Sequence, residues 1–240
     1  MFAFVAQMVH SGAMTATRRA RHRAATIDEI KEAALAQIAT EGAAALSIRG
    51  VARAIGMSPA GLYRYYEGLD GLITELITDA YSDLADHVLT VTEAPGPLRD
   101  RFRDGMLAYR QWAVQHPNRF LLIFGTPIPG YAAPEEGPTV AANRRLGGAF
   151  FALGVEAWHR GELQLPAGSR PPSAEERALA DEELDGVPAD FVAAFLSSWA
   201  HFHGLVSLEI LHQLDWIYPD AAAFFAAEVE TIADGLMAGH

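Results

Sequence analysis

The side chains best suited to chemistry in this chain form hydrogen bonds rather than attack covalent bonds, and they gather in residues 47–66. This stretch holds two serines, three arginines and three tyrosines among small residues. Hydroxyl and guanidinium groups on an exposed helix bind phosphate oxygens and the edges of base pairs. The pattern indicates contact with double-stranded DNA through Ser47, Arg49, Ser58, Pro59, Ala60, Gly61, Tyr63, Arg64 and Tyr65.

Two short helices must position these side chains. Ser47 can cap a helix over residues 48–55, and Gly56 ends that helix because glycine tolerates a left-handed backbone. Ser58 and Pro59 restart a helix at once, with a hydroxyl cap followed by proline in the first turn. Helices so close together must cross steeply, so the spacing predicts a helix-turn-helix whose second helix faces outward.

The segment before this motif predicts a supporting helix. Thr26 and Glu29 have the spacing of a capping box, so we expect the helix to start at Thr26. Its apolar residues recur at helical spacing and would cover the helix-turn-helix. These residues are Ile27, Ile30, Ala34 and Ile38.

Residues 1–23 are expected to be a flexible arm, and Met8 or Met14 is an alternative start of the chain. The arm carries Arg18, Arg19, Arg21 and Arg23. Such a basic arm can lie along phosphates or enter a minor groove. The alternative is a solvated tail, but the arm directly precedes the predicted DNA-binding motif, which favours a role in DNA binding.

Residues 26–76 resemble the DNA-binding part of the TetR family of transcriptional regulators. The resemblance rests on Glu41-Gly42, Leu46-Ser47-Ile48, Val51-Ala52, Ile55-Gly56-Met57-Ser58, Leu62-Tyr63-Arg64-Tyr65-Tyr66 and Leu72, in that order. Two positions depart from the family pattern. Leu69 stands where the family usually has a lysine that meets a phosphate, and Gly61 stands where serine or threonine is common.

A second resemblance lies further along the chain. Trp199, His203 and Gly204 are similar to a segment in the ligand domain of one TetR subgroup, as are His116-Pro117 and Phe124-Gly125. The resemblance implies a helical body that binds a small molecule and a dimer formed by the last two helices.

Composition and charge limit the possible functions of the 240 residues. Residues 1–66 carry a net charge of +4 and residues 67–240 one of −16, which places the attraction for phosphates on the predicted DNA-binding part. The total of −12 argues against a protein that coats DNA nonspecifically. Cysteine is absent, which excludes disulfides and fits the cytoplasm. No run of 18 uncharged apolar residues is present, so no membrane span is expected.

The apolar periodicity predicts an all-α fold with about nine helices. A three-helix head over residues 24–70 would stand on a larger helical body over residues 71–240. The expected helices of the body cover residues 69–91, 98–115, 139–160, 190–214 and 221–237, with short ones after Pro117 and over 175–184. Prolines and glycines predict a loop over 125–138.

Large aromatic residues are frequent in the body, and an ordinary helical core would explain each of them singly. As a group they are candidates for a mostly apolar ligand pocket with few polar groups. The candidates are Met106, Tyr109, Trp112, Phe120, Phe124, Phe151, Trp158, Trp199 and His203.

The last two helices carry more apolar surface than we expect one chain to bury internally, which predicts a dimer interface. A twofold dimer reads two half-sites, whereas a single recognition helix binds weakly. The predicted interface residues are Phe191, Phe195, Phe202, Leu205, Phe224, Phe225, Val229 and Ile232.

The leading hypothesis is a DNA-binding repressor that a small apolar or amphipathic ligand releases from its operator. The alternatives are an activator, or a regulator that docks on DNA or a partner without a ligand. We expect no enzyme and no cofactor, because no nucleophile motif or cofactor loop is present. No metal site is expected either, because His201 and His203 point to different sides of a helix.

Overall fold

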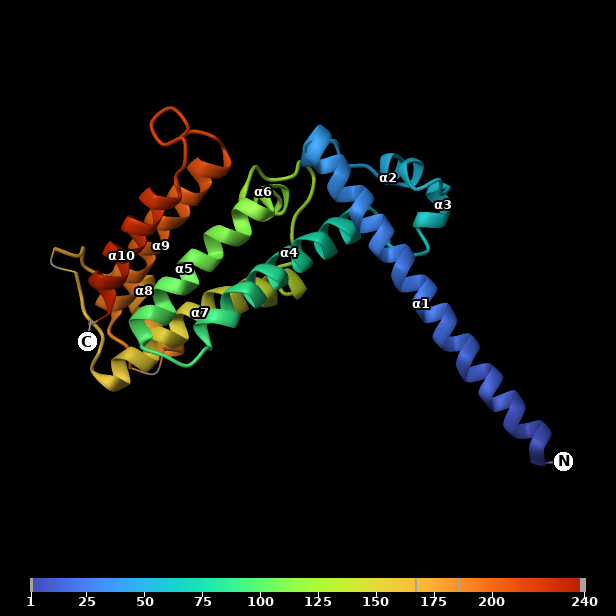
Figure 1. Ribbon diagram of the computed structural model, residues 1–240, viewed down its shortest axis with the longest axis horizontal. Coiled ribbons are helices and arrows are strands. Elements are labelled where there is room, and N and C mark those ends of the chain that lie inside the picture. Colours follow the sequence, from blue (N-terminus) through green and yellow to red (C-terminus); the bar gives the residue numbers. More distant parts are fainter. Residues whose placement is uncertain (1, 167, 185, 238–240) are drawn as a thin grey trace. The chain divides into compact units, whose positions relative to one another are not determined.

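The computed structural model describes residues 2–166, 168–184 and 186–237, and for residues 2–17 and Glu183 it describes the backbone alone. Within these residues the fold is all-α, as predicted, with ten α-helices rather than about nine (Figure 1). Their bounds are α1 Phe2–Glu41, α2 Ile48–Ala54, α3 Pro59–Leu62, α4 Leu69–Thr92, α5 Leu98–Gln115, α6 Pro117–Phe124, α7 Pro138–Arg160, α8 Ala174–Glu183, α9 Ala189–Ile210 and α10 Ala222–Leu236, with a short 3-10 helix at Ala43–Ala45.

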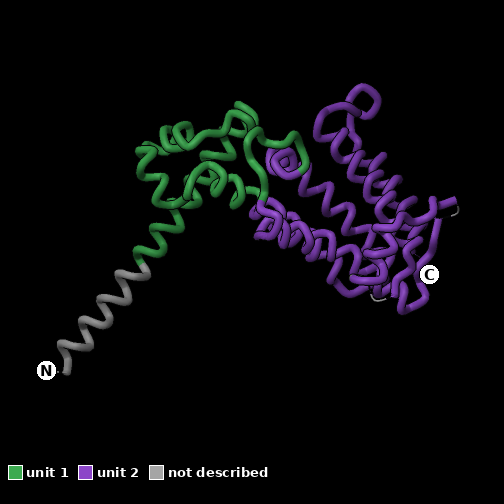
Figure 2. The backbone as a smooth tube through the Cα atoms, turned by 180° about the vertical axis from the view of Figure 1, so that it is seen from behind, with its two compact units in different colours: residues 1–77, 124–133 green, residues 78–123, 134–240 purple. Residues whose placement is uncertain are grey.

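The chain divides into two compact units (Figure 2). The first unit comprises residues 1–77 together with Phe124–Ala133, and the second comprises Thr78–Ile123 together with residues 134–240. The predicted boundaries, with a head over 24–70 and a body over 71–240, remain predictions.

The first unit has a small core in which α1 packs on α2, and α2 on α3. The apolar stripe predicted on α1 is largely inside, because Ile30, Ala34 and Ile38 are buried. Val51 of α2 and Leu62 of α3 meet it from the other side of the core, and both are fully buried. This core fixes the direction in which α3 presents its outer face.

The helix start predicted at Thr26 is wrong. Residues 18–25 are helical, and the Thr26 hydroxyl donates to the carbonyl oxygen of His22 at 3.0 Å instead of capping a first turn. The stretch before Thr26 consists of Arg, Ala and His without a glycine or proline, so nothing in it stops a helix from continuing. The flexibility expected of the arm remains a prediction, and the side chains of its residues 1–17 lie outside the described ones.

In the second unit, α5, α9 and α10 lie side by side, and α8 packs on α9 (Figure 1). Glycines set the closest approaches. A Cβ atom on Gly154 of α7 would lie 2.4 Å from the Phe191 ring of α9, so this ring can pack so close to α7 because residue 154 is glycine. Gly105 of α5 is similarly close to Thr92 and Phe150. The core of this unit is therefore specified by shape as well as by hydrophobicity.

One described helix, α9, is long and apolar enough to cross a membrane by its length and composition alone. It packs against α5, α8 and α10, which is also the environment of a core helix.

The predicted end of α9 at residue 214 is four residues too late, since α9 ends at Ile210. His212 has a φ of 57°, and the N–H of Gln213 donates to the carbonyl oxygen of Leu208, which is the hydrogen-bond pattern of a left-handed helix cap.

Candidate nucleic-acid interface

The two predicted caps form and build the helix-turn-helix. The Ser47 hydroxyl accepts from the N–H of Gly50, and the Ser58 hydroxyl accepts from the N–H of Gly61, each at 3.1 Å. Gly56 has a φ of 66°, which places the turn in the left-handed region that favours glycine. The N–H of Met57 closes the turn onto the carbonyl oxygen of Ala52 at 2.8 Å.

The second helix of this motif is anchored on one side and free on the other. Leu62 is fully buried, whereas 57% of Tyr63 is exposed. Most of the predicted DNA contacts are likewise exposed: Arg49, Ser58, Pro59, Ala60 and Arg64. The remaining predicted contacts in this motif are half-buried: Ser47, Gly61 and Tyr65. The geometry leaves a polar and aromatic surface open to a groove of DNA.

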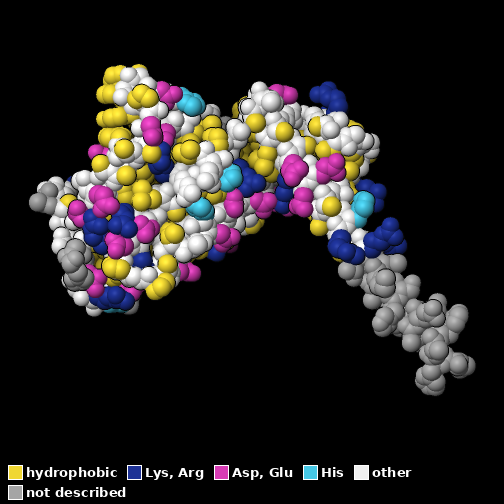
Figure 3. Space-filling model, in the orientation of Figure 1, with side chains coloured by type: hydrophobic (Ala, Val, Ile, Leu, Met, Phe, Trp, Pro, Cys, Tyr) yellow, Lys and Arg dark blue, Asp and Glu magenta, His cyan; other side chains and the backbone are white. Residues whose placement is uncertain are grey.

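Basic side chains lie beside this surface on α1. Arg18, Arg19, Arg21 and Arg23 are all exposed, and Figure 3 shows basic groups gathered at the described start of α1. The Arg23 guanidinium lies over the Tyr65 ring, 5.0 Å from its centroid. This cation–π contact ties the predicted arm to the residues that follow α3.

The start of α2 is supported by Gln37 of α1, a residue that no sequence pattern indicated. Gln37 of α1 accepts from the N–H of Ser47 at 3.4 Å and donates to the carbonyl oxygen of Ala45 at 3.2 Å. Gly50 lies directly above it, since a Cβ atom there would be 2.7 Å from the Gln37 amide. A glycine inside a predicted helix is the one sequence signal that could have indicated this close contact.

Two family models and several relatives match this chain. The model for bacterial regulatory proteins of the tetR family matches residues 30–76, which hold the helix-turn-helix. The model for the Tetracyclin repressor-like C-terminal domain matches residues 102–232, more than half of the chain. This chain belongs to the TetR family.

Individual relatives agree with this assignment. The HTH-type transcriptional regulator Rv1816 of Mycobacterium tuberculosis is 35% identical over 192 residues, covering 77% of this chain and 80% of the relative. The solved structure of SCO4313 is 35% identical, with a TM-score of 0.70, and covers 88% of this chain and 97% of that one. A TetR family transcription regulator from Marinobacter aquaeolei VT8, 16% identical, shares the fold with a TM-score of 0.64, over 93% and 100% of the chains. This TetR protein is therefore a DNA-binding transcriptional regulator and not an enzyme.

In the second unit of this TetR regulator, four of the nine predicted pocket residues gather at one polar pair. The Tyr109 hydroxyl and the His203 Nδ1 atom are 2.8 Å apart. The Trp199 ring stacks on the His203 ring with centroids 4.8 Å apart, and the Phe120 ring lies 5.7 Å from it. Burial raises the pKa of Tyr109 well above its usual value and lowers the pKa of His203.

The other predicted pocket residues are distributed more widely. Met106 and Trp112 are buried, and the Trp112 indole N–H donates to the Asp83 carboxylate at 3.0 Å. Phe151 is half-buried against Phe195, and 43% of Trp158 is exposed. Phe124 belongs to the first unit, and the other candidates belong to the second.

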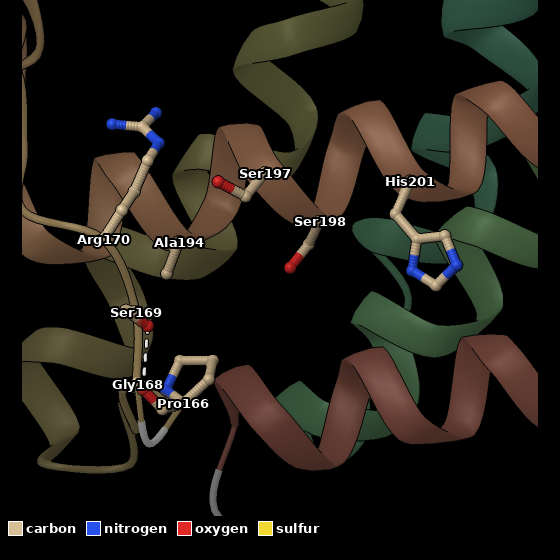
Figure 4. A pocket seen from close by; sticks show the side chains of 8 residues that line it. All are labelled: Pro166, Gly168, Ser169, Arg170, Ala194, Ser197, Ser198 and His201. Atoms are coloured by element: carbon tan, nitrogen blue, oxygen red, sulfur yellow. Dashed lines mark hydrogen bonds between the residues drawn. The ribbon is translucent and has the colours of Figure 1, made fainter.

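Two pockets of the second unit are lined by other residues. One of about 360 Å³ lies between the Pro166–Arg170 loop and one face of α9, where Ser198 and His201 contribute (Figure 4). Its Arg170 side chain points away from Ser198 and His201 in Figure 4 and pairs with the Glu176 carboxylate. The other pocket, of about 440 Å³, lies between α5, α9 and the loop that precedes α10. Neither pocket contains any of the predicted ligand residues, whose role remains a prediction.

Most of the predicted dimer residues are buried within the single chain. The buried ones are Phe191, Phe195, Phe202, Phe225, Val229 and Ile232, whereas Leu205 and Phe224 are partly exposed. The expectation that these helices carry more apolar surface than one chain can bury is therefore wrong for the six buried residues. They fill the core between α9, α10 and their neighbours, so other side chains of these helices must face any partner.

Proposed function

We propose that this TetR regulator is a repressor that binds a near-palindromic operator as a homodimer and leaves it when a small apolar or amphipathic ligand binds. The observation that carries the DNA-binding part is the outward surface of α3 and the turn after it, where Tyr63 and Arg64 are exposed while Leu62 of α3 is fixed in the core. A rigid helix with small residues at its start, Ala60 and Gly61, can enter a major groove.

The proposed contacts divide into two kinds. Arg64 and Tyr63 would reach base edges, since both are exposed in the turn that directly follows α3. Ser47, Arg49 and the arginines of α1 would bind phosphates, which position the protein without reading sequence. Leu69 supplies no charge where the family usually has lysine, so the arginines carry more of the phosphate attraction.

For the dimer we propose the outward face of α9 and α10 in place of their buried phenylalanines. On α9 this face has three small residues and one histidine at helical spacing: Ser197, Ala200, His201 and Gly204. A Cβ atom on Gly204 would meet nothing within 4 Å, so the space above this glycine is open for a neighbouring helix. Leu211, Trp216 and Ile217 follow in an exposed loop, with Trp216 81% exposed, and would extend the contact.

A ligand signal has a covalent route to the DNA-binding part. The segment Phe124–Ala133 belongs to the first unit, although it connects α6 with α7 of the second. Tyr131 of this segment shares a hydrogen bond of 3.0 Å with Thr74 of α4. A ligand that moves α6 or α7 would therefore pull on the first unit at this segment, and its coupling to DNA would be on the order of 1–3 kcal/mol.

The test is binding of a fluorescent duplex taken from the region upstream of the protein's own gene. We expect a dissociation constant on the order of 10⁻⁸ M or tighter, and the affinity should fall as salt rises. The double variant Tyr63→Ala, Arg64→Ala should bind at least tenfold more weakly, and the control Arg144→Ala, an exposed arginine of α7, should bind as the parent does. Equal affinity for a shuffled duplex would refute operator recognition.

Repressor and activator differ in the cell, not in the DNA contact. Deleting the gene should raise expression of its target if the protein is a repressor, and should lower it if the protein is an activator. A regulator of transcription acts on the chromosome, so we place its work in the bacterial cytoplasm. Adding candidate small molecules without any loss of DNA affinity would favour a ligand-independent regulator.

A further inference from the structure

The pocket of about 440 Å³ in the second unit has the size and mixed walls of a small-molecule site. It is lined by the end of α5, the first residue of α6, the end of α9 and the loop before α10. None of the residues predicted for a ligand from the sequence takes part in it. The aromatic core is filled by its own side chains, whereas this pocket leaves room for a ligand.

An ion pair on one wall of this pocket brings no net charge. Arg110 donates to both oxygens of the Glu209 carboxylate, at 2.7 and 2.5 Å, and each side chain is 18% exposed. The Arg110 guanidinium also lies 5.5 Å from the centroid of the Phe225 ring. A bidentate pair held in this way is a rigid part of the pocket, and its two charges cancel.

Apolar groups make up much of the remaining wall. Val114 is 45% exposed although it is aliphatic, and Pro117, Ile210 and Pro219 lie around the same space. The Tyr218 ring adds an aromatic surface. An exposed aliphatic side chain at a concave site gains stability when an apolar ligand covers it.

The remaining charges of the pocket are negative. The Asp215 carboxylate lies 3.1 Å from the His212 Nδ1 atom, and the Asp220 carboxylate accepts a hydrogen bond from the N–H of Ala222 at 2.9 Å. With histidine counted as uncharged, these carboxylates leave the pocket with a net charge of −2 beside its neutral ion pair. The left-handed backbone of His212, with a φ of 57°, ends α9 at this point and so directs the loop along the pocket.

We infer that this pocket binds an amphipathic organic cation, with the apolar part against Val114 and Tyr218 and the positive group near Asp215 and Asp220. An anion of the same shape would meet two carboxylates and no free positive charge. The binding itself stands apart from the proposed repressor. Only its effect on DNA rests on the proposed function, because Pro117 begins α6 and α6 leads into Phe124–Ala133.

Tetraphenylphosphonium and tetraphenylborate are suitable probes, because they are nearly equal in size and opposite in charge. Isothermal titration of the full chain should show saturable binding of the cation and at least tenfold weaker binding of the anion. Stronger binding of tetraphenylborate would overturn the inference, and so would the absence of saturable tetraphenylphosphonium binding.

Variants at one exposed position locate the probe. Val114→Lys and Val114→Glu both remove the aliphatic contact, but only lysine adds a positive charge, so Val114→Lys should bind phosphonium at least fivefold more weakly than Val114→Glu does. Both changes are tolerable at a partly exposed site. Asp215→Asn should weaken phosphonium binding about two- to fivefold, because water and salt screen the attraction of an exposed charge. The matched control Asp181→Asn, on the exposed side of α8, should have no effect. If Val114→Lys and Val114→Glu bind phosphonium with equal affinity, the probe binds elsewhere and the proposed site is refuted.

The effect on DNA is measured separately. The parent protein is first bound to its upstream duplex without probe, which tests the proposed function alone. Phosphonium at saturating concentration should then weaken DNA binding of the parent but not of Val114→Lys. If DNA binds and phosphonium binds but the two do not interact, the site stands as a binding site and its proposed regulatory role fails.

Discussion

The amide of Gln37 occupies the space that a side chain on Gly50 would need, with only 2.7 Å between that amide and an added Cβ atom. The same amide bonds to the backbone at Ala45 and Ser47, on the way into α2. The pair therefore fixes the distance between α1 and the helix-turn-helix.

Gly50→Ala tests this contact. Alanine is favoured over glycine in a helix by about 1 kcal/mol, but here its methyl group must displace Gln37. We expect Gly50→Ala to give no gain in the parent and a gain of about 1 kcal/mol in a Gln37→Ala background, measured by urea unfolding. Equal gains in both backgrounds would show that the two residues do not interfere.

The stacking of Arg23 on Tyr65 predicts a shared role in DNA binding. Arg23→Ala should weaken operator binding several-fold and reduce the salt slope by about one, because one phosphate contact is lost. Tyr65→Leu should weaken binding through the loss of the same arrangement. In anisotropy titrations, the double variant should bind DNA about as weakly as the single variant with the larger loss of affinity. If the two losses of affinity multiply fully in the double variant, the residues act separately.

Glu176 predicts a stability change at acidic pH. The hydrogen bonds from Arg170 and from the N–H of Ser173 lower the pKa of Glu176 from its usual 4.5 to about 2. A lowered carboxyl pKa stabilises the folded state above pH 4.5, and this contribution is lost as the pH falls toward 2. Glu176→Gln should therefore be less stable than the parent at pH 7, and the gap should close near pH 2. The exposed Glu182→Gln on the same helix is the control, and a gap that stays constant with pH would contradict the assignment.

His203 predicts a second pH effect in the neutral range. Burial lowers the pKa of His203, so the unfolded chain binds a proton more readily than the folded one as the pH falls below about 6.5. The stabilising effect of a neutral His203 is thus present above that pH and is lost as the pH drops. Thermal unfolding of His203→Gln should depend less on pH between 7 and 5 than that of the parent, and an unchanged dependence would point to other groups.

Local signals in the sequence predicted the motif well, and contacts between distant residues lay beyond them. Ser47, Gly56 and Ser58-Pro59 act on their own neighbours, so their caps and turn could be inferred from order alone. Thr26 had the same kind of signal, but the helix continued through it because a capping residue cannot stop a favourable helix by itself. Gln37 and Gly50 are far apart in sequence, and only the fold brings them together.

The faces of α9 could not be assigned from its sequence. Apolar and small residues occur all around this helix, so periodicity does not separate the core side from an outer side. Phe191 and Phe195 proved to be inside, and Gly204 opens to free space. The ion pair of Arg110 with Glu209, which is central to the pocket between α5 and α9, likewise joins residues that no local pattern connects.

The most direct measurement uses the absence of cysteine from the chain. A single cysteine at Glu67, an exposed residue just after the helix-turn-helix, can carry a DNA-cleaving iron chelate, with Glu182→Cys in α8 as the control. On the upstream duplex we predict two clusters of cuts related by twofold symmetry from the first variant and none from the second. A single cluster, or no cuts while the duplex is bound, would contradict a dimer that reads DNA through α3.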